Sequence, residues 1–173
     1  GDVVEALIRI EQESLCSARP KITFLGAQNG LDPEVTLGTD RLQQFETEFL
    51  PPVVNYSDHL RQFPLVIHPS RSESFGMAAL ETVAAGVPLL AASSGVIPSF
   101  IDNKAFLFPP ADVALLADRM AQWFSETDLS LQESFQIQNV QSRLKQEYST
   151  TSTVLSLMNN YEQIVDSKAW SKG

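Results

Sequence analysis

The chain has 173 residues, of which 43% are hydrophobic and 19% are charged, so it fits one domain, residues 1–173, and is neither a disordered chain nor a coiled coil. Its 12 Lys and Arg residues against 21 Asp and Glu residues give a net charge of −9, which disfavours binding to the phosphate backbone of nucleic acids. One cysteine, Cys16, excludes an internal disulfide framework and a cysteine-based metal cluster, and only two histidines disfavour a histidine-based metal site.

Taken in chain order, hydrophobic periodicity and turn residues predict alternating helices and strands. Helices are predicted over residues 2–14, 40–49 and 77–85, then after Asp112 as N-cap, and twice more toward the C-terminus, the last around residues 154–165. Strands are predicted over residues 21–25, 53–56, 65–68, 88–92 and 105–108. Short apolar strands that alternate with helices are typical of a parallel sheet covered on both faces, which predicts the doubly wound, Rossmann-like α/β class.

The sequence has no segment that reads as a membrane span or a targeting signal. The most apolar stretch, residues 77–101, is interrupted by glycine and proline and carries Glu81. The first residues are not the basic and then apolar run of a secretory leader. We therefore expect a cytoplasmic protein, which could bind a membrane peripherally in its full-length form. Because the chain starts abruptly in an amphipathic pattern, we expect it to be a fragment of a longer one.

In a doubly wound fold, ligands bind outside the carboxyl ends of the strands, and the polar loop over residues 69–76 lies in such a position. The helix that follows is apolar or small apart from Glu81 and a threonine, so we expect it to be buried all round. Helical side chains lean toward the N-terminus, which directs Glu81 toward the loop that carries Glu73. Two carboxylates are therefore expected near one crevice.

The same crevice should also receive backbone amides from the start of the helix, at Phe75, Gly76 and Met77, and such amides bind anions. Carboxylates beside amide donors suit a ligand that has both hydroxyl and phosphate groups, such as a nucleotide sugar. The residues alone leave an alternative open. Glu81 could pair with a nearby Arg or Lys, and Glu73 could be a solvated loop residue.

The segment over residues 66–88 resembles the retaining glycosyltransferases of the GT-B fold, of the large family 4 (group 1) type. The resemblance is carried by Pro69-Ser70, Glu73-Ser74-Phe75-Gly76, Leu80-Glu81 and Gly86-Val87-Pro88 at the family's offsets. Two glutamates separated by seven residues are the family's signature. The resemblance extends over residues 50–165, and it implies that this chain is the C-terminal, donor-binding half of a GT-B enzyme.

The resemblance also implies a set of roles. Glu73 would touch the donor sugar and support its transfer, and Glu81 would hold the ribose hydroxyls. Backbone amides would bind the sugar and diphosphate, and two further residues would line the site. One of these, His68, could instead be a core histidine whose hydrogen bonds are satisfied within the protein. The amides are those of Ser74, Phe75, Gly76 and Met77, and the lining residues are His68 and Gly95. The donor would be a nucleotide sugar such as a UDP- or GDP-hexose, with no cofactor and no metal ion.

Three departures from the family pattern suggest a second interpretation. The Gly-Arg and Lys that clamp the diphosphate are absent, Pro98-Ser99 replaces Pro-Glu, and Lys104-Ala105-Phe106 lacks the family's glycine. The N-terminal, acceptor-binding domain is also missing, so we expect the fragment alone to be inactive. The alternative is a catalytically silent, glycosyltransferase-like binding module of a larger signalling or effector protein.

Overall fold

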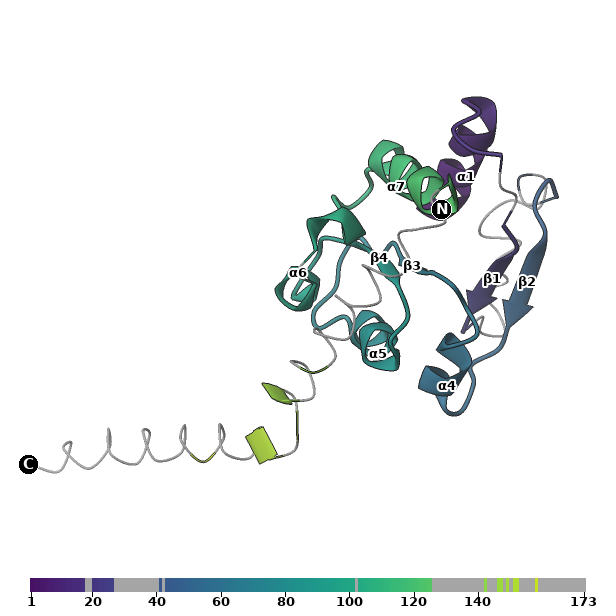
Figure 1. Ribbon diagram of the computed structural model, residues 1–173. Coiled ribbons are helices and arrows are strands. Elements are labelled where there is room, and N and C mark those ends of the chain that lie inside the picture. The colour runs from purple at the N-terminus through teal and green to yellow at the C-terminus, as the bar shows by residue number, and fades with distance from the viewer. Residues whose placement is uncertain are drawn as a thin grey trace, which may run out of the picture.

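A computed structural model of the chain describes residues 1–17, 20–26, 41, 43–101 and 103–125, together with single positions at 142, 146, 147, 149, 151, 152 and 158. The two helices predicted toward the C-terminus therefore lie outside the described residues, apart from these isolated positions. The described part contains parallel strands with helices packed on either side (Figure 1). This arrangement agrees with the predicted α/β class.

The strands form two parallel sheets. The first contains β1 (Ile22–Leu25) and β2 (Thr47–Leu50), and the second contains β3 (Val66–His68), β4 (Leu89–Ala92) and β5 (Leu107–Phe108), in the order β3-β4-β5. All pairs are parallel, with Ile22 opposite Thr47 and His68 opposite Ala91. Every residue of the central strand β4 is buried, as expected for a parallel strand that is covered on both faces.

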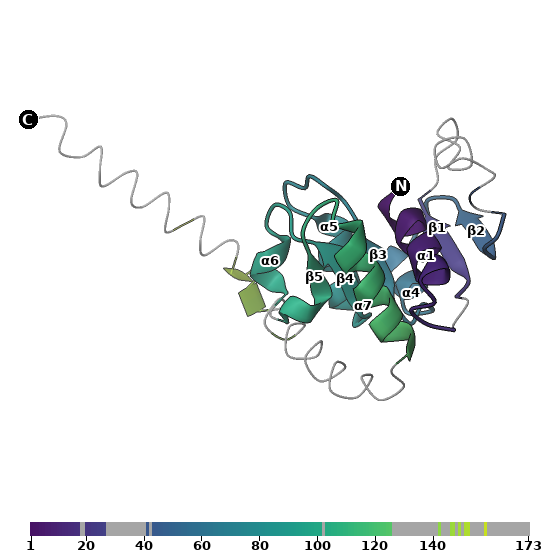
Figure 2. The same cartoon turned by 90° about the horizontal axis from the view of Figure 1, so that it is seen from above.

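The helices cover both sides of the strands. They are α1 (Asp2–Gln12), α4 (Tyr56–Leu60), α5 (Met77–Ala85), α6 (Ile97–Phe100) and α7 (Val113–Ser125), with a 3₁₀ turn η1 (Lys104–Phe106) before β5. Helices α1 and α7 pack side by side on one side of β3 and β4, and α5 lies on the other (Figures 1 and 2). One apolar core joins α1, α5, α6 and α7 to β4 and β5.

The ends of the helices follow local capping rules. The Oδ1 atom of Asp112 accepts the Leu115 amide at 2.9 Å, which confirms Asp112 as the cap of α7. Helix α5 has the predicted bounds and lies between two glycines with positive φ, Gly76 at 69° and Gly86 at 79°. It is not buried all round, because Met77 is 54% exposed and Ala84 is also exposed. The helix therefore presents part of its first turn to solvent.

The helix predicted over residues 40–49 was wrong from residue 43 onward, although Arg41 is helical, and the strand predicted over residues 53–56 was wrong. Residues 47–49, expected to be helical, belong to β2, because pairing with β1 brings the rings of Phe24 and Phe49 into a stack with centroids 4.9 Å apart. The strand expected over 53–56 is absent, although valines favour strands. Val54 is 91% exposed, and Asn55 adopts φ 61° as the residue before α4.

Two smaller differences concern where β5 begins and how the strands are divided between sheets. The strand predicted over residues 105–108 begins only at Leu107, because the Asn103 side chain accepts the Ala105 amide at 2.9 Å and starts a 3₁₀ turn. The second difference is that the described strands form two sheets rather than one. Both β1 and β3 line a cavity of about 410 Å³, which lies where a single sheet would pair them.

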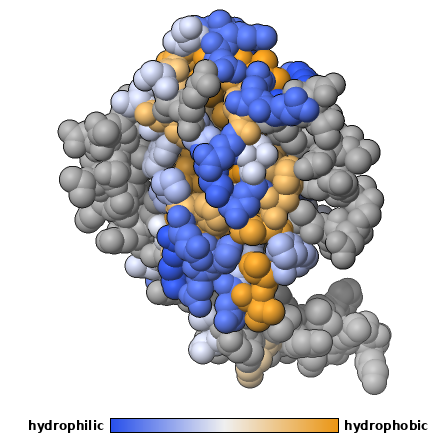
Figure 3. Space-filling view, turned by 90° about the vertical axis from the view of Figure 1, so that its right-hand side faces the viewer, coloured by the Kyte–Doolittle hydropathy of each residue, from blue (hydrophilic) through white to orange (hydrophobic). Residues whose placement is uncertain are grey.

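The β1–β2 sheet is less deeply buried than the β3–β5 sheet, since every residue of β1 and β2 is half-buried. Viewed from this end of the molecule, hydrophobic residues show between hydrophilic ones (Figure 3). Among the described residues, no helix is both long and apolar enough to cross a membrane.

Candidate functional site

Six of the eight predicted site residues lie at the carboxyl end of β3 or in the segment that follows it, while Glu81 lies within α5 and Gly95 follows β4. The β3–α5 loop, residues 69–76, connects His68 at the end of β3 to Met77 at the start of α5. It packs against the β4–α6 turn, residues 93–96, which follows the neighbouring strand β4. This is the edge of a parallel sheet at which doubly wound folds bind ligands.

The side chain of Glu73 is paired with His68. Nε2 of His68 lies 3.1 Å from Oε1 of Glu73, and the two side chains are 18% and 26% exposed. An ionised carboxylate only accepts hydrogen bonds, so Nε2 carries the proton and donates it. Glu73 is thus an oriented, largely buried carboxylate rather than a freely solvated loop residue.

The main chain at Glu73 is held by Gly95. A Cβ atom at position 95 would lie 2.0 Å from the Glu73 carbonyl oxygen, and Gly95 has a φ of 55° that favours glycine. Next to it, the buried Ser94 hydroxyl donates to the Ser70 carbonyl at 3.0 Å. The β4–α6 turn therefore contacts the β3–α5 loop backbone to backbone.

Gly76 allows a second close approach, between the end of the β3–α5 loop and α6. A Cβ atom there would lie 2.8 Å from Cγ1 of Ile97, a fully buried residue of α6. Met77 follows as the first residue of α5, and the amides of a first helical turn have no acceptor within their own helix. The side chains of Phe75 and Met77 are 40% and 54% exposed, so the loop presents both backbone and apolar groups to solvent.

Glu81 lies half-buried on α5, just over one turn after Met77. It forms no ion pair with any Lys or Arg in the described part of the chain, so the alternative of a basic partner for Glu81 finds no support there. Its charge does act on Tyr56, at the start of α4. Burial, and secondarily the negative charge of Glu81, raise the pKa of the Tyr56 phenol.

Helix α4 packs against α5. The Arg61 side chain, just after α4, donates from Nε to the Ala85 carbonyl at 3.3 Å, and Leu60 is fully buried with Ala85 and Val87. These contacts fix α4 on α5. Among the described residues, Glu81 thus acts on an aromatic hydroxyl and pairs with no cation, which leaves its carboxylate available to accept hydrogen bonds.

An ion pair between Asp2 and Arg71 was not foreseen from the sequence. Arg71 donates from Nη2 to Oδ1 of Asp2 at 2.6 Å and from Nε to Oδ2 at 3.1 Å. The Asp2 side chain is only 10% exposed, at the first residue of α1. The two residues are 69 positions apart, so no local spacing could have revealed the contact, which ties the β3–α5 loop to α1.

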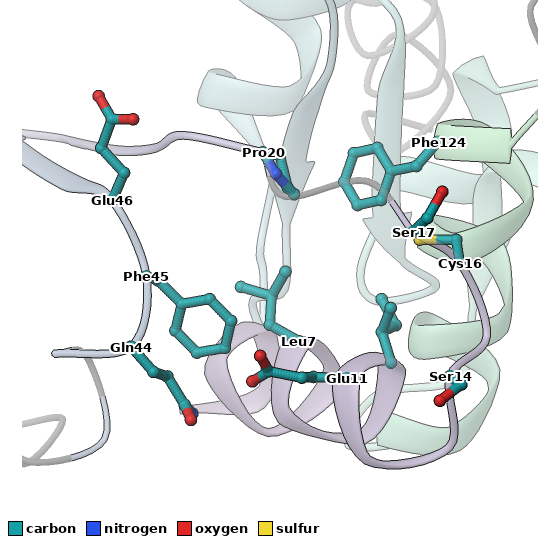
Figure 4. Close-up of a pocket in the computed structure, with 11 residues that line it drawn as sticks. Leu7, Glu11, Ser14, Cys16, Ser17, Pro20, Gln44, Phe45, Glu46 and Phe124 are labelled. Atoms are coloured by element: carbon teal, nitrogen blue, oxygen red, sulfur yellow. The ribbon is translucent and has the colours of Figure 1, made fainter.

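A second pocket lies away from this loop. It has a volume of about 620 Å³, and its described lining residues come from α1, the segment after it, residues 44–46 and the end of α7 (Figure 4). Leu7 and Phe45 lie on one part of its wall, and the Cys16 thiol lies on another. Among the described residues, no three His, Cys, Asp or Glu side chains form a group that could hold a metal ion.

Comparison with known proteins gives three findings. The family model for "Glycosyl transferases group 1" matches residues 3–141. The curated relatives include a D-inositol 3-phosphate glycosyltransferase of Saccharomonospora viridis, 37% identical over 99 residues, which are 53% of this chain and 21% of the relative. Another, from Streptomyces avermitilis, is 46% identical over 86 residues, which are 47% of this chain and 18% of the relative.

Solved structures show the same fold. Sucrose-phosphate synthase from Thermosynechococcus elongatus aligns with a TM-score of 0.67 and 16% identity, over 95% of this chain and 42% of that one. Anabaena Alr3699/HepE in complex with UDP aligns with a TM-score of 0.69 and 15% identity, over 92% and 52%. The predicted Rossmann-like α/β fold is thereby confirmed. The matched region is about a fifth of the length of these curated relatives and about half of these solved chains.

Proposed function

Since the chain belongs to the group 1 glycosyl transferases, we propose that it forms the nucleotide-sugar-binding, C-terminal domain of a retaining GT-B enzyme. The observation that carries the proposal is the pair of carboxylates on the β3–α5 segment, one in the loop before α5 and one in the middle of the helix. Glu73 is oriented by a hydrogen bond, and Glu81 has no ion-pair partner among the described residues. A ligand that offers hydroxyl groups to both would complete the site.

In this proposal, Glu73 contacts the donor sugar and supports its transfer, while Glu81 accepts hydrogen bonds from the ribose hydroxyls. A carboxylate accepts strong hydrogen bonds from hydroxyl groups, and partial burial strengthens these hydrogen bonds because the local dielectric is lower than that of water. The sugar and diphosphate would bind the backbone amides of Ser74, Phe75, Gly76 and Met77, at the positive end of α5. The exposure of Phe75 and Met77 supports their place at a ligand-accessible surface.

The proposed reaction breaks the bond between the anomeric carbon of a hexose and a diphosphate oxygen, and forms a bond from that carbon to an acceptor hydroxyl, whose proton passes to the leaving diphosphate. The acceptor would be held by an N-terminal domain, since the chain matches only about a fifth of its curated relatives. We therefore propose that this chain alone transfers no sugar. Protein donors rather than a metal ion would neutralise the leaving diphosphate, so transfer should continue in EDTA.

Binding of nucleotides tests the proposal directly. Alr3699/HepE has been solved with UDP and with UDP-glucose, so these are the first probes, followed by GDP and ADP. We expect calorimetric titration to show binding of one of these nucleotides. Glu81→Ala should weaken that binding about tenfold or more, because hydrogen bonds to a charged group are lost. Asp118→Ala, an exposed carboxylate of α7, is the matched control and should bind like the wild type.

Two titration results would contradict the proposal. If one nucleotide binds and Glu81→Ala binds it as tightly as Asp118→Ala does, the ribose role of Glu81 is wrong. If the full-length protein binds none of these probes, the proposal of a nucleotide-sugar site is wrong as a whole.

A non-catalytic binding module is the second candidate, and one observation favours it. Where the family usually has a glutamate after Pro98, this chain has Ser99, whose hydroxyl donates to the Val96 carbonyl at 2.6 Å. Position 99 therefore offers a locally bonded hydroxyl instead of a charge. Sugar transfer by the full-length protein, abolished by Glu73→Gln, would exclude this candidate. Nucleotide binding without transfer, unchanged by Glu73→Gln, would support it.

A further inference from the structure

The carboxylate of Glu73 is held in two independent ways, and the residues that hold it have different tasks. We propose that His68 is a positioning residue, which fixes the Glu73 side chain for the reaction by donating its Nε2 proton to Oε1, while Gly95 fixes the main chain at the same residue. This inference rests on the proposed function, because it concerns how the carboxylate of that site is oriented.

The position of His68 in the fold suits it to orient the Glu73 side chain. His68 is the last residue of β3 and lies opposite Ala91 of the fully buried strand β4. Its side chain is 18% exposed, and its backbone belongs to the sheet rather than to the loop that carries Glu73. A donor on a strand restricts a carboxylate better than a donor on the same loop would, since the strand has fewer conformations of its own.

The contact at Gly95 removes the remaining freedom of the loop. Because the Glu73 carbonyl lies where a Cβ of residue 95 would be, the backbone at Glu73 is packed against the β4–α6 turn. With the main chain fixed there and Oε1 bonded to His68, the side chain has one oxygen left, Oε2, which has no hydrogen bond among the described residues. That oxygen is the one available to a ligand.

Steady-state kinetics of the full-length protein with UDP-glucose, or with whichever nucleotide sugar the titration identifies, tests the inference. His68→Leu removes the donor and should lower kcat about tenfold to a hundredfold, while KM for the donor sugar changes less than about twofold. His68→Gln retains an N–H that reaches toward Oε1 and should recover most of the lost rate. His59→Leu, in α4, changes the other histidine of the described chain and should leave kcat and KM unchanged.

Two results for the His68 variants by themselves would overturn the inference. If His68→Leu raises KM and leaves kcat unchanged, His68 binds the donor directly. If His68→Gln is as slow as His68→Leu, the hydrogen bond is not what matters. Thermal unfolding of each variant separates both cases from loss of folding. Glu73→Gln, measured in parallel, distinguishes the inference from its premise: full activity of Glu73→Gln refutes the proposed function, whereas a wild-type rate of His68→Leu beside an inactive Glu73→Gln refutes only the role of His68.

Discussion

Three glycines with positive φ allow the contact between the β4–α6 turn and the β3–α5 loop to be measured as a stability difference. Gly26 has a φ of 81° and nothing within 4 Å of a built Cβ atom, so Gly26→Ala tests backbone strain alone. A left-handed conformation costs a non-glycine residue about 1–2 kcal/mol, and alanine recovers part of this by restricting the unfolded chain. We therefore expect Gly26→Ala to lower the free energy of unfolding by about 1 kcal/mol.

Gly95→Ala adds a collision to the same strain. Its Cβ atom would lie 2.0 Å from the Glu73 carbonyl oxygen, whereas ordinary contacts begin at 3.4 Å, so the backbone would have to move by about 1.4 Å. Overpacking of this kind costs about 1–3 kcal/mol beyond the strain, giving a total near 3 kcal/mol. Gly76→Ala should fall between the two, because its Cβ meets the Ile97 side chain rather than backbone.

Urea unfolding followed by circular dichroism measures the series, provided that the m-values of the variants agree. The expected order of destabilisation is Gly26→Ala, then Gly76→Ala, then Gly95→Ala. If Gly95→Ala is no more destabilised than Gly26→Ala, the two loops are not packed backbone to backbone, and the account of how Glu73 is held is wrong.

Three other predictions follow from buried and ionisable groups. Phe100→Ala should lower the free energy of unfolding by about 3–5 kcal/mol in the same urea assay, because this ring is 1% exposed in the main core. The hydrogen bond from Arg71 lowers the pKa of Asp2, so the stability lost in Asp2→Asn should be largest above about pH 4 and shrink on further acidification; a pH-independent difference would contradict this. Glu81→Gln should lower the pKa of the Tyr56 phenol, measured by spectrophotometric titration, and an unchanged or higher value would show that the two groups do not interact.

The fold was predictable where local pattern and tertiary structure agree. Helix α5 was predicted with its observed bounds because small apolar residues run between Gly76 and Gly86, and both glycines end the helix by their backbone conformation. Strand β4 was equally readable, since a short apolar run between turns becomes the buried centre of a parallel sheet.

The errors arose where pairing with a distant segment decides the structure. Thr47–Leu50 forms a strand because β1 lies beside it, and the two valines before Asn55 form none because no strand pairs with them in the described structure. The same limit applied to the site. The two glutamates were visible as a motif, but the hydrogen bond from His68 to Glu73 and the ion pair between Asp2 and Arg71 depend on loop geometry that spacing does not encode.

The backbone contact between Gly95 and Glu73 also bears on how such a site can diversify. The β3–α5 loop is held by the Gly95 contact, by the hydrogen bond from Ser94 and by the ion pair between Arg71 and Asp2, and the exposed side chains of Ser72 and Ser74 take no part in these contacts. Ser72 and Ser74 can therefore be exchanged without loss of the shape of the loop, while position 95 must stay glycine. Under the proposed function, these two positions are the starting point for a library of variants with altered donor specificity, because changing them leaves the contacts that hold the loop intact.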